Sequence, residues 1–169
     1  MAIQKKLPYP SMRGYFAHYL YEEMVKNKKI YIITGDLGYK MWDQIKKDFP
    51  DRFINAGASE QAMMGIAVGL ALEGKIPFVY SIPTFLLYRA FETIRNYLNI
   101  EKIPVRLVGS GRGRDYTHDG ITHWPEEEKE VMAIFQNIKS IWPENLTEIA
   151  VLVKKMVKAN RPWYINLKR

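Results

Sequence analysis

Residues 53–91 read FINAGASEQAMMGIAVGLALEGKIPFVYSIPTFLLYRAF, and this stretch decides the fold class. A glycine-bearing turn precedes a lone carboxylate, Glu60, which opens a nearly uncharged helical run of small residues. An apolar strand and an aromatic cluster follow. Burying an ionisable group is costly unless it has a partner. Glu60 is therefore either a first-turn residue favoured by the helix dipole or a functional acid.

The composition is that of one ordinary globular domain. The 169 residues suffice for a single core, and the hydrophobic fraction of 47% is typical of soluble folds. The chain has no cysteine, which excludes a disulfide framework and thiol chemistry. No apolar run approaches the roughly 18 residues that span a membrane, and the N-terminus lacks a signal core. We therefore expect a cytoplasmic protein without membrane association.

The formal net charge of +7 raises the question of nucleic-acid binding. The basic residues are scattered among acidic ones rather than gathered into one block. A solvated surface, or attraction to phosphorylated sugars or an acidic partner, explains such a pattern equally well. We expect no nucleic-acid partner.

Helical and strand-like segments alternate along the chain. Residues 1–10 are predicted to form an irregular N-terminal arm and residues 11–169 the domain. We expect strands at 29–34, 52–55, 77–81, 104–110, 138–142 and 162–167. We expect helices at 11–27, 41–50, from 60 onward, 84–99, 126–135 and 145–159. This alternation predicts an α/β fold, a three-layer α/β/α sandwich with a mostly parallel sheet.

The stretch AGASEQAMMGIAVGLALEGKIPFVYSIPTFLLYRAFETIRN resembles the pyrimidine-binding domain of transketolase and related thiamine diphosphate enzymes. The resemblance covers nearly the whole chain. In that family an acid at the start of this helix hydrogen-bonds the ring nitrogen of the cofactor's aminopyrimidine. The resemblance implies that Glu60 is the catalytic and cofactor-binding acid. The family often has histidine next, where this chain has Gln61.

Aromatic and turn residues extend the predicted cofactor site. Phe85, Tyr88 and Phe91 have the i, i+3, i+6 spacing that places side chains along one side of a helix. Such a stripe is usually core, but the resemblance implies that it seats the pyrimidine, with Tyr88 at the stacking position. Asp36 lies in a tight turn after the predicted first strand, where open α/β sheets place their sites. We expect it to contact the cofactor.

The segment from Gly109 to Trp124 is predicted to be a long loop with three titratable residues, His118, Asp119 and His123. Two histidines and one aspartate could hold a metal, but without a second cluster we assign none. The run DGITH resembles the DGPTH motif of transketolase. This implies that Asp119, with His118 beside it, recognises substrate, and that His123 transfers protons. A further substrate histidine of the family would fall near Gly111, and its absence suggests a different or larger substrate.

Two arginines complete the predicted site. The resemblance aligns Arg13 and Arg169 with the pair that grips a sugar phosphate in transketolase. A guanidinium matches phosphate bidentately, although surface arginines are also common without any such role. The family's phosphate-contacting serine would fall near Lys40, so phosphate on the substrate stays an open question.

Half of the expected cofactor site is missing from this sequence. The family holds Mg²⁺ and the diphosphate through a GDG…N motif on another domain, and the chain has neither that motif nor a third domain. We therefore expect a small subunit that works with a separate diphosphate-binding subunit, transfers a two-carbon ketol unit, and self-associates into a heterotetramer. Two alternatives stay open: a β-type component of a 2-oxo acid decarboxylase or dehydrogenase, and a non-catalytic self-associating scaffold.

Overall fold

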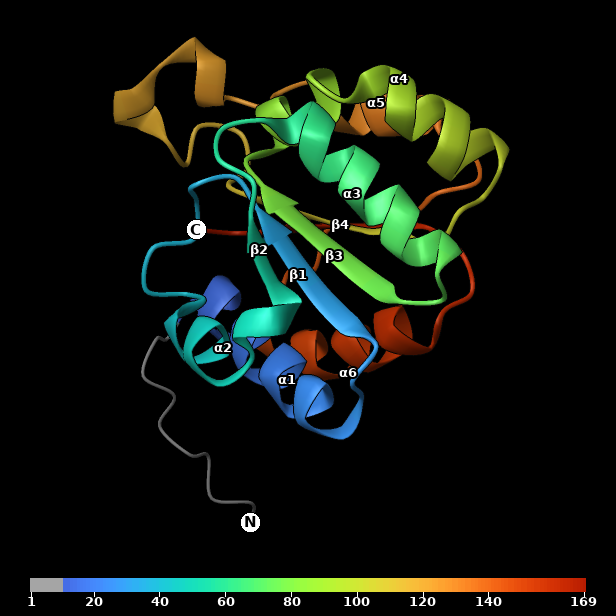
Figure 1. Ribbon diagram of the computed structural model, residues 1–169. Coiled ribbons are helices and arrows are strands. Elements are labelled where there is room, and N and C mark those ends of the chain that lie inside the picture. Colours follow the sequence, from blue (N-terminus) through green and yellow to red (C-terminus); the bar gives the residue numbers. More distant parts are fainter. Residues whose placement is uncertain (1–10) are drawn as a thin grey trace.

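A six-stranded parallel sheet forms the centre of the structure, a computed structural model that describes residues 11–169 (Figure 1). The predicted arm, residues 1–10, lies outside the described residues. The strands run in the order β2-β1-β3-β4-β6-β5, and every neighbouring pair is parallel. They are β1 (Ile30–Thr34), β2 (Phe53–Asn55), β3 (Ile76–Ser81), β4 (Arg106–Ser110), β5 (Lys139–Ile141) and β6 (Trp163–Leu167).

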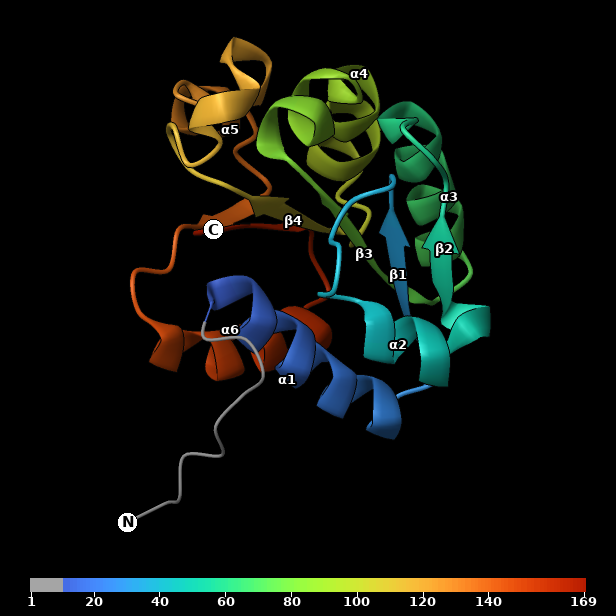
Figure 2. The ribbon, with the colours of Figure 1, turned by 90° about the vertical axis from the view of Figure 1, so that its left-hand side faces the viewer.

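Helices cover both faces of this sheet, which confirms the predicted three-layer sandwich (Figure 2). On one face lie α1 (Met12–Lys26), α2 (Asp43–Asp48) and α6 (Leu146–Lys158). On the other lie α3 (Glu60–Leu72), α4 (Phe91–Thr93) and α5 (Glu128–Ile134). Short 3₁₀ turns occur at Pro50–Arg52, Thr117–Asp119 and Ile121–His123. Among the described residues, no helix is both long and apolar enough to cross a membrane.

Alternation of side chains along the strands builds two separate cores. Ile32 of β1 packs with the α1 and α6 side, while its neighbour Ile33 packs with the α3 side. Tyr164 and Ile165 of β6 divide in the same way. Because successive strand residues point to opposite faces, an apolar run of this kind requires cover on both.

Local capping explains where the two long helices on the first face begin. The Ser11 side chain accepts a hydrogen bond from the Gly14 N–H at 3.2 Å, so Ser11 caps α1 at the start of the predicted range. Asn145 and Glu148 form a reciprocal capping box at the start of α6. These elements match the sequence predictions to within a residue or two.

The prediction of one regular helix over residues 84–99 is wrong, because the helix is interrupted. The segment is broken into a π-helical turn at Thr84–Tyr88, the short α4, and a second π-helical turn at Ile94–Ile100. Ala90 departs from helical geometry with φ −109° and ψ 20°. No side chain caps the start of this segment, and the Thr84 hydroxyl instead donates to the Thr122 carbonyl oxygen at 2.7 Å. A tertiary contact has replaced the local one, and π-helical turns of this kind are frequent at functional sites.

Candidate functional site

Glu60 opens α3 and is almost completely buried, with 2% of its surface exposed. Its Oε1 accepts a hydrogen bond from the Ser81 hydroxyl at 3.2 Å, from the carboxyl end of β3. Its Oε2 accepts one from Arg89 Nη1 at 2.7 Å, and the two form an ion pair. A buried carboxylate with one hydroxyl and one cationic partner is satisfied, as the cost of burial requires.

Arg89 also lies flat against an aromatic ring. Its guanidinium carbon is 4.0 Å from the centroid of the Phe85 ring, the distance of a cation–π contact. Its side chain is still 47% exposed, whereas that of Glu60 is 1% exposed. The place beside Glu60 and over Phe85 therefore accepts a flat group that donates hydrogen bonds and reaches solvent on one side.

The loop that carries the predicted substrate residues meets this aromatic ring. The His123 ring lies edge-on to Phe85 with centroids 4.9 Å apart, and its Nδ1 is 2.9 Å from the Thr122 hydroxyl. The Thr84–Thr122 hydrogen bond ties the loop to the π-helical turn. His123 is thus brought next to the predicted cofactor cluster, although it is more than 30 residues away in sequence.

The other two aromatic residues do not continue the surface that the sequence predicts. Phe91 packs against Phe135 of the core, with ring centroids 5.1 Å apart. Tyr88 is 36% exposed, and burial together with the nearby Glu127 raises the pKa of its hydroxyl. The expected single aromatic stripe is wrong, because the broken helix turns Phe85 toward the loop and Phe91 into the core.

Tyr116 occupies the space where the family's histidine is missing. A side chain at Gly111, which has a φ of 94°, would clash with the Tyr116 ring. The Tyr116 hydroxyl is 3.3 Å from the Ser110 hydroxyl, and its ring centroid is 5.9 Å from that of His123. Glycine at 111 is required both by the left-handed backbone and by this ring.

The two predicted phosphate arginines lie near the same group of hydroxyls. Arg169 lies over the Tyr116 ring at 4.7 Å, and its backbone N–H donates to an Asp115 carboxylate oxygen at 3.1 Å. Arg13 lies beside Tyr80. Burial raises the pKa of the Tyr80 hydroxyl, and the nearby Ser110 and Arg13 side chains oppose this rise. Among the described residues, the buried Arg13 Nε has no hydrogen-bond partner. A chain of neighbouring side chains connects the two arginines. It runs from Arg13 through Tyr80, Ser110 and Tyr116 to Arg169.

Three predicted residues lie at the surface rather than in this cluster. His118 and Asp119 are exposed in the 3₁₀ turn Thr117–Asp119, and no side-chain contact joins them to Glu60 or Phe85 in residues 11–169. The described chain has no group of three or more metal-ligating side chains. Asp36 is exposed with a φ of 56°, and its carboxylate accepts a 2.7 Å hydrogen bond from Asn55. That bond ties the ends of β1 and β2 together.

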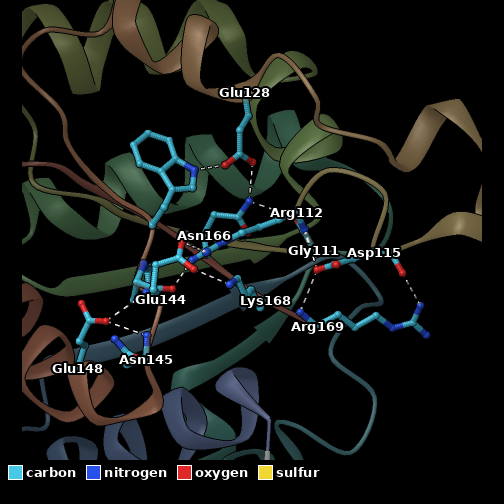
Figure 3. A network of polar contacts seen from close by, with 12 residues as sticks. Gly111, Arg112, Asp115, Glu128, Glu144, Asn145, Glu148, Asn166, Lys168 and Arg169 are labelled. Carbon is cyan, nitrogen blue, oxygen red and sulfur yellow. Dashed lines mark hydrogen bonds and ion pairs between the residues drawn. The ribbon is translucent and has the colours of Figure 1, made fainter.

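A second buried carboxylate, Glu128, fixes the base of the loop (Figure 3). It is 4% exposed and accepts hydrogen bonds from Trp142, Asn166 and Tyr164, the last at 3.2 Å. Burial raises the pKa of its carboxyl, although these donors oppose the shift. Asn166 also donates to the Gly111 carbonyl oxygen at 3.0 Å. Glu128 therefore joins α5 and β6 to the start of the loop.

Sequence reasoning missed Arg89, Ser81 and Tyr116. Arg89 follows Tyr88 directly, and a single basic residue in an aromatic helical run is normally a solvent contact. Ser81 ends a buried apolar strand, which is a usable signal because side chains at that edge face the site. Tyr116 has no local signal, since only the folded loop places its ring over Gly111.

Comparison with known proteins agrees with this geometry. The profile of the family described as "Transketolase, pyrimidine binding domain" matches residues 9–169. A Methanocaldococcus jannaschii protein, named as the C-terminal section of a transketolase, is 32% identical over 95% of this chain and 51% of its own length. One subunit of the apulose-4-phosphate transketolase of Actinobacillus succinogenes is 33% identical over 72% of this chain and 39% of its own. The chain thus spans about half the length, or less, of these curated relatives.

Solved structures show the same relationship. A structure described as "Split gene transketolase, inactive beta4 tetramer" is 32% identical, with a TM-score of 0.83, over 94% of this chain and 51% of its own. A transketolase from Pichia stipitis, at 20% identity and a TM-score of 0.82 over 94% of this chain and 25% of its own, shares the fold. The predicted resemblance is confirmed: the chain belongs to the family of transketolase pyrimidine-binding domains.

Proposed function

We propose that this chain is the pyrimidine-binding subunit of a split, transketolase-like enzyme that depends on thiamine diphosphate. With a separately encoded diphosphate-binding subunit, it would transfer a two-carbon ketol unit between sugars or sugar phosphates. The chain is not expected to be active alone, because the diphosphate and Mg²⁺ would be held by the partner.

The observation that carries the proposal is the pairing of a buried acid with an aromatic face. Glu60 is enclosed yet accepts a hydrogen bond from a planar, N–H-bearing group that lies on Phe85. An aminopyrimidine is also planar and N–H-bearing, so these residues fit it. When bound, thiamine diphosphate supplies the nucleophilic carbon that breaks and forms carbon–carbon bonds beside a carbonyl.

Each residue of the cluster has a distinct part in the proposal. Glu60 shares a proton with the ring nitrogen of the pyrimidine, in an enclosed site where that sharing is strong. Phe85 provides the aromatic face, the partly exposed Tyr88 is assigned a separate contact with the cofactor, and Phe91 supports the segment from the core side. His123, beside Phe85, moves a proton at the substrate. Asp36 reaches the cofactor from the end of β1.

Substrate recognition is assigned to the loop and the two arginines. Asp119 and His118 are exposed, as groups that meet an incoming sugar should be. Arg13 and Arg169 lie at the two ends of a group formed by the buried Tyr80 and Ser110 and the half-buried Tyr116, and their guanidinium groups suit the phosphate end of a substrate. The unpartnered Nε of Arg13 within the described residues supports an anion there.

The names of relatives support a partner subunit and self-association. The Actinobacillus succinogenes relative is named as one subunit of its transketolase. Another, 27% identical over 94% of this chain, is 6-deoxy-6-sulfo-D-fructose transketolase subunit SqwH of Clostridium sp. (strain MSTE9). The split-gene neighbour is described as a tetramer of β chains. We propose a heterotetramer of two such subunits and two partners.

Co-purification from the native host tests the proposal directly. A tagged chain is recovered with thiamine diphosphate and Mg²⁺ present, and the proteins retained with it are identified. We expect a partner with a GDG…N motif, and ketol transfer by the reconstituted pair when ketose donors are supplied. Turnover of 2-oxo acids alone would instead favour the β-type component of a decarboxylase or dehydrogenase. Recovery of the chain only with itself, without bound cofactor, would favour the scaffold.

A further inference from the structure

Arg89 has no part in the function proposed above, yet it forms an ion pair with the buried acid of the candidate site. Among residues 11–169 it is the one cation within ion-pair distance of Glu60, at 2.7 Å. Its guanidinium also lies 4.0 Å from the centroid of the Phe85 ring. The two groups expected to receive the cofactor's pyrimidine are therefore both engaged by one side chain.

A guanidinium and an aminopyrimidine present the same features to these two groups. Both are flat, both offer N–H donors in the plane of the group, and both stack on aromatic rings. The carboxylate and the aromatic face cannot serve both at the same time. Binding of an aminopyrimidine at Glu60 and Phe85 therefore requires that Arg89 leave.

The exposure of the pair shows which partner is free to move. The Arg89 side chain is 47% exposed, while that of Glu60 is 1% exposed and is also held by the Ser81 hydroxyl. Glu60 is fixed by its surroundings, and Arg89 has solvent on one side. Rotation of the Arg89 side chain would vacate the place without any change in the core.

We infer that Arg89 is a positioning residue that stands in for the aminopyrimidine and is displaced when the cofactor binds. In the unloaded subunit it keeps the buried carboxylate paired and the space over Phe85 filled. It thereby preserves the geometry of the site. Because it occupies the place of the pyrimidine, it also competes with the cofactor for that place. This inference rests on the proposed function.

Cofactor binding to the reconstituted pair tests the inference without reference to turnover. Thiamine diphosphate is titrated into complexes with the wild-type chain, Arg89→Met and Arg95→Met, and binding is followed by calorimetry. Arg95 is a matched control, because it is exposed on the same segment and bonds only to the neighbouring Asn96 among the described residues. We expect Arg89→Met to lower the Kd about tenfold, equivalent to about 1.4 kcal/mol, and Arg95→Met to leave it unchanged.

Chemical rescue provides a second measurement if Arg89→Met alters folding. In Arg89→Ala, ethylguanidinium at low millimolar concentration should re-enter the vacated place. It should raise the Tm of the lone subunit and raise the Kd for thiamine diphosphate in the complex. Arg95→Ala should show neither effect.

The outcomes separate this inference from the proposed function. A wild-type complex that binds no thiamine diphosphate overturns the proposed function and this inference with it. A wild-type complex that binds it, with Arg89→Met equal or weaker and ethylguanidinium without effect on Arg89→Ala, overturns this inference alone.

Discussion

Glu60 and Glu128 are both buried carboxylates, but their partners differ in kind. Glu60 is paired with Arg89, whose side chain is 47% exposed, and with one hydroxyl. Glu128 is enclosed by Trp142, which directly follows β5, and by Tyr164 and Asn166 of β6. Glu60 therefore has a partner that can move away into solvent, whereas Glu128 has none among these three donors.

We expect this difference to separate the acid that we propose to be functional from a structural one. The donors around Glu128 come from β6 and from the segment after β5, so they cannot withdraw without disturbing the sheet. Arg89 is attached to a broken helical segment and faces solvent on one side. Burial alone therefore does not mark a reactive carboxylate, and the exposed partner of Glu60 supports the role that we propose for it.

Replacement of the reactive carboxylate should have the largest effect. Glu60→Gln keeps the shape and the Ser81 contact but removes the charge that we propose shares a proton with the cofactor. We expect turnover by the reconstituted complex to fall by about 10²–10⁴-fold, the range typical of general acid–base groups. Steady-state assays check this, with the exposed Glu92→Gln as the control. A fully active Glu60→Gln complex would remove Glu60 from cofactor activation.

Loss of the structural carboxylate should instead appear in stability. Glu128→Ala leaves the Trp142, Tyr164 and Asn166 donors without their acceptor, which costs about 3 kcal/mol because buried unsatisfied groups pay their full desolvation. Urea unfolding of the lone subunit measures this. Glu130→Ala, exposed in the same helix, is the control. Equal stability of the two variants would show that the cluster around Glu128 is not structural.

The hydroxyl that orients Glu60 should have a smaller effect. Ser81→Ala removes the 3.2 Å donor to Oε1 and leaves the Arg89 contact in place. We expect the turnover rate of the reconstituted complex to fall about fivefold, since the net contribution of one hydrogen bond is about 1 kcal/mol. Urea unfolding and turnover are measured together, with Ser140→Ala as the control. A loss of stability without loss of activity would contradict the orienting role.

The pH dependence of stability should be the smallest of these effects. Burial raises the pKa of Glu128, so the folded protein retains that proton where the unfolded chain, with a pKa of about 4.3, has lost it. The resulting stability is present below the unfolded pKa and is lost as pH rises through the folded pKa. Glu128→Gln, which mimics the protonated acid, should not show this loss. Parallel stability curves for the two proteins between about pH 4 and 8 would contradict the assignment.

Most of the architecture could be predicted, because it depends on local signals. The alternation of helices with apolar strands required a parallel sheet, and the Ser11 and Asn145 caps mark helix starts through contacts three residues away. Local signals also predict one continuous helix over residues 84–99. Its break arises from packing and from the Thr84–Thr122 hydrogen bond, which joins residues 38 apart.

The fold class, the family and the position of the buried acid follow from the sequence, since these depend on periodicity and on motifs at fixed spacing. The groups that surround that acid are set by the three-dimensional packing. Arg89 lies 29 residues from Glu60, and Tyr116 fills the space above Gly111 through the path of a loop. Such contacts depend on how separate elements converge at the edge of the sheet, and no local pattern records that convergence.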